Sequence, residues 1–147
     1  MGVSVLLGTH SYQLDAKGRI SLPAKFRERL DDGAYLTLGQ DGCLWVFPQS
    51  EFDRVSDEVH AASLGSPEGR AYSRIFFGSA DDVKPDGQGR LTIPLRLRQL
   101  AGIEREAVVI GVRDRIEVWD RTTWERYSDQ FGGAYQTGAI SPGGRTA

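Results

Sequence analysis

Hydrophobic and polar residues alternate along two short stretches of the chain that resemble each other closely. Residues 19–22 read Arg-Ile-Ser-Leu, and residues 90–93 read Arg-Leu-Thr-Ile. A period of two is typical of a strand with one buried face and one polar face. The pattern therefore predicts two short strands of the same kind.

The similarity extends beyond these strands and indicates an internal repeat. Residues 14–23 align with residues 85–94 at an offset of 71, with Asp, Gly, Arg and Pro at identical positions. After one inserted residue, residues 35–47 align with residues 107–119. Self-similarity of this extent predicts two copies of one structural unit of about 45 residues.

Both copies predict the same order of elements. Gly18 and Gly89 stand before the alternating strands, at turn positions that favour the left-handed backbone conformation. Pro23 and Pro94 follow those strands and begin a short helix in each copy. Two further strands are expected in each copy, over residues 35–38, 44–47, 107–110 and 116–119.

Helices are expected to close each copy and to connect the two. Ser50 and Asp120 are the expected N-caps of the closing helices, and a further helix begins after Ser66. The glycine-rich end of the chain has few apolar residues and is expected to be disordered. The predicted organisation is a first repeat at 8–55, a connecting helical segment at 56–80, a second repeat at 81–128 and a disordered tail at 129–147.

A unit of this size buries too little apolar surface to be stable alone, so the two copies are expected to pack against each other. Aromatic residues are the expected members of a shared core: Trp45, Phe47, Phe52, Trp119 and Trp124. The predicted fold is α+β and mainly β, with tandem repeats packed as an intramolecular pseudo-dimer with short helices.

Composition excludes several classes of protein. Apolar residues make up 39% and charged residues 26%, as in a globular domain. No apolar run approaches the ~18 residues of a membrane span, and no signal peptide is evident, so a cytoplasmic location is expected. One cysteine and two histidines predict no metal site. No catalytic or phosphate-loop motif is present, so we expect neither enzyme activity nor a cofactor or small-molecule substrate.

Charge is distributed unevenly. The net charge is −2, yet residues 17–29 carry +4 and residues 84–98 carry +3. A positive face on an acidic body attracts a polyanion through its local field. Short basic helices that are simply solvated explain the same charges without any partner.

The two Asp-x-x-Gly-Arg segments carry the candidate binding chemistry. A tight turn alone explains the aspartate and the glycine. It does not explain why Arg19 and Arg90 occupy equivalent positions, each followed by a basic helix. An aspartate that orients the guanidinium leaves donors for a phosphate or a guanine edge, so these arginines are the expected DNA-reading residues.

The motifs resemble the bacterial MraZ family of transcriptional regulators over about residues 6–128. The resemblance is carried by residues 8–10, 15–27, 39–41, 44–48 and 86–94. It implies two AbrB-like domains of the swapped-hairpin type, ring-shaped homo-oligomers and a nucleoid-associated protein. It also implies binding of double-stranded DNA at promoter repeats of the division and cell-wall gene cluster.

The resemblance also assigns the site. The DNA-binding motif of the family, Asp-x-x-x-Arg, falls on Asp15 with Arg19 and on Asp86 with Arg90. The remaining expected members of the DNA-binding surface are Lys17, Gly18, Lys25, Arg27, Gln88, Gly89, Arg96 and Arg98. The lysine and arginine side chains beside the loops are expected to contact phosphates. Gln88 stands where the first loop has a lysine, so the second loop is expected to hold phosphates more weakly.

A protein-interaction module is the alternative, such as an antitoxin-type regulator whose AbrB-like body clamps a partner protein. Such a regulator is expected to have a long C-terminal segment with apolar anchors that folds on binding. Here the tail offers only Tyr135 and Ile140 among glycines, so the sequence favours DNA as the main ligand.

Overall fold

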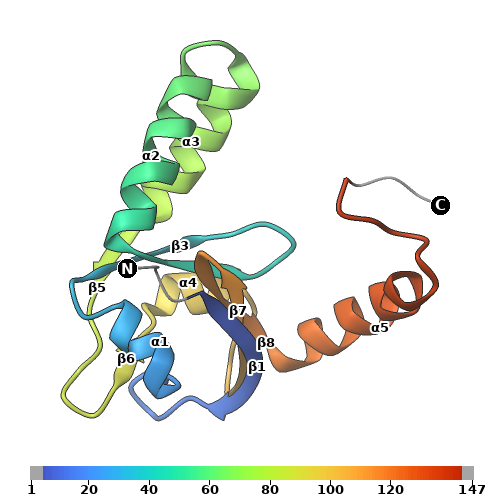
Figure 1. The fold of residues 1–147 in the computed structure, drawn as a ribbon. Coiled ribbons are helices and arrows are strands. Elements are labelled where there is room, and N and C mark those ends of the chain that lie inside the picture. The colour runs from blue at the N-terminus through green and yellow to red at the C-terminus, as the bar shows by residue number, and fades with distance from the viewer. Residues whose placement is uncertain (1–4, 144–147) are drawn as a thin grey trace.

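The computed structural model describes residues 5–143 and has the predicted α+β architecture (Figure 1). The first half contains β1 (Leu6–Gln13), β2 (Arg19–Ser21), α1 (Ala24–Arg29), β3 (Ala34–Leu38), β4 (Leu44–Pro48) and α2 (Gln49–Ser63). After α3 (Pro67–Ser79), the second half contains β5 (Asp81–Val83), β6 (Arg90–Thr92), α4 (Leu95–Leu100), β7 (Glu106–Arg113), β8 (Arg115–Asp120) and α5 (Arg121–Thr137). The two halves therefore share one order of elements.

The two halves exchange their first strands. Six strands form an antiparallel sheet in the order β1-β7-β8-β4-β3-β5, and β2 pairs with β6 in a separate two-stranded ribbon. In the large sheet β1 pairs with β7 of the second half, and β5 pairs with β3 of the first half. Each half thus completes the sheet of the other, which is the swapped-hairpin arrangement that the family resemblance implies.

The strand registers define a pseudo-twofold axis. Ile20 lies opposite Leu91 in the β2–β6 ribbon, and Trp45 lies opposite Glu117 between β4 and β8. In each pair the two residues occupy equivalent positions of the aligned repeats. The halves of one chain therefore pack as an intramolecular pseudo-dimer.

Two hydrophobic clusters lie on opposite faces of the large sheet, because successive side chains of a strand point to opposite sides. One cluster is mainly aliphatic and joins the sheet to the ribbon, α1 and α4 through residues such as Ile20, Phe26, Val46, Leu91 and Leu97. The other is aromatic and joins the sheet to α2, α3 and α5, with Trp45, Phe47, Phe52, Phe76 and Trp119 buried and Trp124 partly buried. The predicted aromatic core is present, but it covers one face of the sheet only.

The helices outside the sheet extend in two directions. In Figure 1, α2 and α3 lie side by side as a hairpin that leaves the sheet, and α5 projects from the end of β8 along a different line. Asp120 caps α5 as predicted, because its carboxylate accepts the Thr123 N–H at 3.0 Å. Ser66 likewise caps α3, accepting the Gly69 N–H at 2.9 Å. None of the described helices is long and apolar enough to span a lipid bilayer.

Two local predictions differ from the structure. Ser50 is not an N-cap, because α2 begins at Gln49, directly after Pro48, and has no side-chain cap. The expected disordered tail at 129–147 is also wrong in its first part, because α5 continues to Thr137. The tilted rings of Tyr127 and Phe131 are in contact one helical turn apart along it, with centroids 4.7 Å apart, and this packing supports the helix into its glycine pair. Residues 144–147 lie outside the described residues.

Candidate nucleic-acid interface

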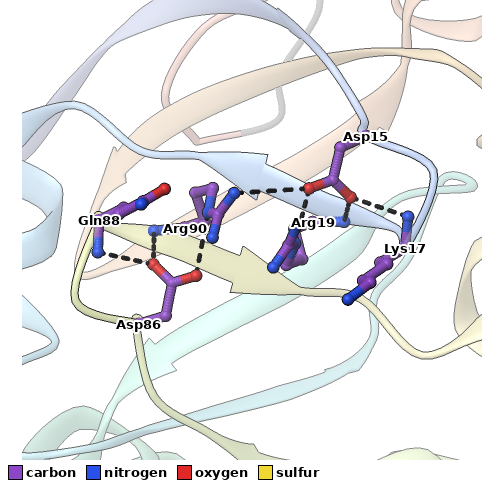
Figure 2. Close-up of polar contacts among 6 residues, drawn as sticks. All are labelled: Asp15, Lys17, Arg19, Asp86, Gln88 and Arg90. Carbon is purple, nitrogen blue, oxygen red and sulfur yellow. Dashed lines mark hydrogen bonds and ion pairs between the residues drawn. The ribbon is translucent and has the colours of Figure 1, made fainter.

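The β2–β6 ribbon separates a buried face from an outer face that carries two arginines. Ile20 and Leu91 point inward and are fully buried. Arg19 and Arg90, one residue earlier on each strand, point outward with side chains that are 28% and 26% exposed. Because the two strands are antiparallel about the pseudo-twofold axis, the arginines lie on the same face (Figure 2).

The first loop is organised by the carboxylate of Asp15. Its Oδ1 atom accepts the backbone N–H groups of Lys17 and Arg19, both at 2.9 Å, and its Oδ2 atom accepts Nε–H of Arg19 at 2.6 Å. Gly18 closes the turn with φ of +76°, a conformation in which a side chain would be strained. The local sequence therefore fixes both the turn and the guanidinium that follows it.

The second loop repeats this geometry. The Oδ1 atom of Asp86 accepts the backbone N–H groups of Gln88 and Arg90, both at 2.9 Å, and Oδ2 accepts Nε–H of Arg90 at 3.0 Å. Gly89 has φ of +75°. The repeat thus extends from the sequence to individual hydrogen bonds, as the two halves of Figure 2 show.

Fixing each arginine through Nε leaves its terminal amino groups as the donors that a ligand would meet. A guanidinium has five N–H donors, and the hydrogen bond to its own loop's aspartate uses only Nε–H. The two loops also approach each other across the axis, where Nη1 of Arg90 lies 3.8 Å from Oδ2 of Asp15. Two oriented guanidinium groups side by side suit recognition of phosphate oxygens or of guanine edges.

Both loop carboxyls are held in the charged form. The backbone N–H of Arg19 stabilises the Asp15 carboxylate and lowers its pKa below the ordinary value of 3.8. The backbone N–H of Arg90 lowers the pKa of Asp86 in the same way. Hydrogen bonds to the charged form of an acid favour that form. The aspartates are therefore ionised near neutral pH.

This arrangement predicts the pH dependence of the loops. Both carboxyls are expected to titrate with midpoints below 3.8, measured from side-chain carboxyl carbon shifts by NMR. Since each folded pKa is lower than the unfolded one, each carboxylate stabilises the fold above its unfolded pKa, and this contribution is lost as the pH falls through the folded pKa. The backbone N–H of Arg19 should shift with the same midpoint as Asp15. A midpoint above 3.8 at either loop would contradict the observed hydrogen bonding.

The helix arginines lie beneath the loops of the opposite half. Gly18 is buried, and a Cβ atom built on it would lie 2.6 Å from Cζ of Arg98. Gly89 is also buried, and a Cβ atom built on it would overlap the side chain of Arg27. Each glycine thus allows an arginine from the other half to lie directly against the turn.

The other expected site residues divide by exposure. Lys17, Lys25, Gln88 and Arg96 are exposed around the ribbon, whereas Arg27 and Arg98 are only half-exposed. Two residues that the sequence analysis did not include among the candidates lie on the same surface. Ser21 and Thr92 are exposed on the outer face of the ribbon, opposite Arg90 and Arg19 respectively. The alternation that predicted the strands also places these hydroxyls beside the arginines, so the signal for them was available.

Neither a metal centre nor a reactive thiol stands out in the part of the chain that the structure describes. Residues 5–143 contain no group of three His, Cys, Asp or Glu side chains that could hold a metal ion. Burial raises the pKa of the Cys43 thiol from 9.0 to about 12, so this side chain is protonated near neutral pH. A protonated thiol is neither a nucleophile nor a metal ligand.

Comparison with known proteins places the chain among close relatives. A family model described as "MraZ protein, putative antitoxin-like" matches residues 5–75 and 76–136, one match for each half. A protein of Salinispora arenicola named transcriptional regulator MraZ is 52% identical over 123 residues, which cover 84% of this chain and 87% of the relative. A relative of the same name from Kineococcus radiotolerans is 47% identical, and the match covers 89% of this chain and 92% of the relative. Another from Thermobifida fusca is 50% identical, and the match covers 84% of this chain and 86% of the relative.

Proposed function

The chain belongs to the MraZ family of transcriptional regulators, and we propose that it acts by binding double-stranded DNA through the outer face of the β2–β6 ribbon. The observation that carries this proposal is the pair of identical Asp–Arg arrangements, Asp15 with Arg19 and Asp86 with Arg90, on one exposed face. A solvated turn needs no guanidinium held in this way at two equivalent positions.

The shape of the ribbon suits the major groove. A two-stranded β-ribbon fits a groove about 12 Å wide, and several DNA-binding folds use one there. Arg19 and Arg90 would read base edges, with guanine O6 and N7 as their best partners. Because each aspartate already orients its arginine, little side-chain entropy is lost on binding.

Exposed basic residues beside the ribbon would contact the phosphates. Lys17 at the first loop, Lys25 on α1 and Arg96 on α4 are all exposed. Gln88 occupies the position of Lys17 in the second loop and carries no charge. The two ends of the reading surface would therefore hold the DNA backbone unequally.

Replacement of Lys25 by alanine is expected to weaken binding to all DNA sequences alike. The slope of log affinity against log salt should fall by about one phosphate contact, because one counterion fewer is released. Titrations of promoter-repeat and scrambled duplexes at several salt concentrations measure this. Arg70→Ala is the matched control, because Arg70 is an exposed residue on α3, and it should leave the slope unchanged. A change in sequence preference with Lys25→Ala would show that this residue reads bases.

We further propose that the protein acts as a ring-shaped homo-oligomer on promoter repeats, in association with the nucleoid, at the division and cell-wall gene cluster. One ribbon presents only two reading arginines, so a single subunit makes few base contacts. Several subunits on adjacent repeats gain affinity through effective concentration. Mass measurement in solution, with and without a duplex that carries the repeats, tests this. A monomer that binds one repeat as tightly as several would contradict it.

A protein partner remains the second candidate ligand. It is favoured by the end of α5, where the Tyr135 side chain is 77% exposed on a helix that continues further than the sequence indicated. Pull-down from lysate with and without nuclease separates the two candidates. Retention of nucleic acid that nuclease removes supports DNA binding, and a protein partner retained after nuclease treatment with no DNA bound supports the alternative.

A further inference from the structure

We infer that Arg27 and Arg98 are positioning residues, and that each sets the geometry of the DNA-reading loop in the opposite half. This inference rests on the proposed function, since it concerns how the proposed reading loops are held. It assigns the two helix arginines to the support of Arg90 and Arg19 instead of to phosphate contacts.

Arg98 contacts the first loop directly and also through the backbone of Ile93. A Cβ atom on Gly18 would lie 2.8 Å from both Nε and Nη2 of Arg98, so the guanidinium covers the turn closely. Nε of Arg98 also donates to the Ile93 carbonyl at 2.9 Å, and the Ile93 N–H donates to the Gly18 carbonyl at 2.9 Å. The first loop is therefore joined to α4 of the second half by packing and by two hydrogen bonds in series.

The contact between Arg27 and the second loop is the symmetric counterpart. A Cβ atom on Gly89 would overlap Cδ and Nη1 of Arg27, and the Leu22 N–H donates to the Gly89 carbonyl at 3.2 Å. Nε of Arg27 is buried and has no hydrogen-bond partner among the described residues. Burial of such a donor is unfavourable by itself, and the side chain nevertheless packs against the second loop.

The helix that carries each arginine is anchored in the aliphatic cluster by the residue just before it. Phe26 and Leu97 directly precede Arg27 and Arg98, and each is only 3% exposed in the aliphatic cluster. Because these neighbours anchor α1 and α4 in the core, the backbone at Arg27 and Arg98 is held beside the opposite loop. Gly18 and Gly89 each meet two requirements at once, because each adopts positive φ and leaves room for the guanidinium.

The crossed arrangement distinguishes a positioning role from a phosphate contact. A phosphate contact acts through charge, so its loss lowers the salt dependence of binding to every sequence. A positioning residue acts through the opposite loop, so its loss alters that loop even in the absence of DNA. The affected loop would be the one in the other half of the chain, 62 residues along the sequence from Arg27 to Gly89.

The first experiment uses the free, full-length protein. Arg27→Met should speed amide hydrogen exchange at Gln88 and Arg90 by about tenfold while leaving Arg19 unchanged, because only the second loop loses its support. Arg98→Met should give the reverse pattern. Lys25→Met and Arg96→Met, exposed neighbours on the same helices, should change neither loop. Equal acceleration in both loops, or acceleration only in the half that carries the substitution, would overturn the inference.

The second experiment measures binding of promoter-repeat duplexes. The effects of Arg27→Met and Arg90→Ala should be strongly non-additive, whereas those of Arg27→Met and Arg19→Ala should be closer to additive, because only the first pair shares one loop. The salt slope should stay at the wild-type value. A slope reduced by about one contact with normal exchange in both loops would make Arg27 a phosphate contact and overturn the inference.

A conservative variant distinguishes a local effect on the second loop from a loss of the whole fold. Arg27→Lys keeps the charge and the aliphatic stem but loses the planar guanidinium, so the second loop should exchange faster than in the wild type and slower than with methionine. Wild-type exchange with lysine and reduced exchange protection throughout the chain with methionine would overturn the positioning role. Because the exchange measurements need no DNA, their failure is distinct from a failure of the chain to bind DNA.

Discussion

Replacement of both Arg19 and Arg90 by alanine is expected to abolish the distinction between promoter repeats and unrelated DNA. Each lost base contact is expected to reduce binding by about 1–3 kcal/mol, and the double variant loses both reading side chains of a subunit. The basic residues around the ribbon remain, so weak binding that depends on salt and not on sequence should persist.

Fluorescence anisotropy with a repeat-containing duplex and a scrambled duplex, at one fixed salt concentration, measures this loss. Arg126→Ala is the matched control, since this exposed arginine lies on α5. The two single substitutions are expected to be only partly additive, because Nη1 of Arg90 also approaches Asp15 of the first loop at 3.8 Å. Retained sequence preference in the double variant would exclude the ribbon as the reading surface.

Of all the substitutions considered, replacement of Glu117 by leucine is expected to lower the free energy of unfolding the most. This carboxylate accepts Nε1–H of Trp45 and of Trp119, each at 3.0 Å, and Nη2–H of Arg115 at 2.9 Å. Its side chain is 12% exposed, and the Arg115 guanidinium also covers the Trp45 ring at 4.9 Å. Leucine leaves both indole donors buried without an acceptor, which costs about 1–3 kcal/mol for each.

Urea unfolding measures this effect as a lower midpoint with an unchanged slope. Glu117→Gln keeps one carbonyl oxygen as an acceptor and should lose less free energy of unfolding than leucine does. Glu125→Leu is the control, because its exposed ion pair with Arg121 on α5 contributes little. A leucine variant as stable as the wild type would mean that the carboxylate contributes no net stability.

The features that the sequence predicted well are those encoded over a few residues. The turn at Gly18, the outward Arg19 and the inward Ile20 all follow from one short pattern, and the structure contains each of them. The second copy at Gly89 doubles the evidence for this interpretation. Local backbone chemistry is enough here, because a positive φ and an alternating strand leave few other solutions.

The features that could not be predicted from the sequence depend on packing between distant segments of the chain. Nothing near Arg27 in the sequence indicates that it lies against Gly89, because that contact forms only when the halves exchange strands. The length of α5 was missed for a related reason. Gly132 and Gly133 favour a break, but the aromatic side chains packed along the preceding turns override that preference.

The unlike pair at the centre of the sheet has a consequence for how this duplicated protein is assembled. Trp45 and Glu117 occupy the same position of the repeat, yet they face each other as a donor and its acceptor. Two first halves would set indole against indole, and two second halves would set carboxylate against carboxylate, which repel. The two halves are therefore not interchangeable at this position. Each is now the obligate counterpart of the other, and no true dimer of either half would reproduce the unit.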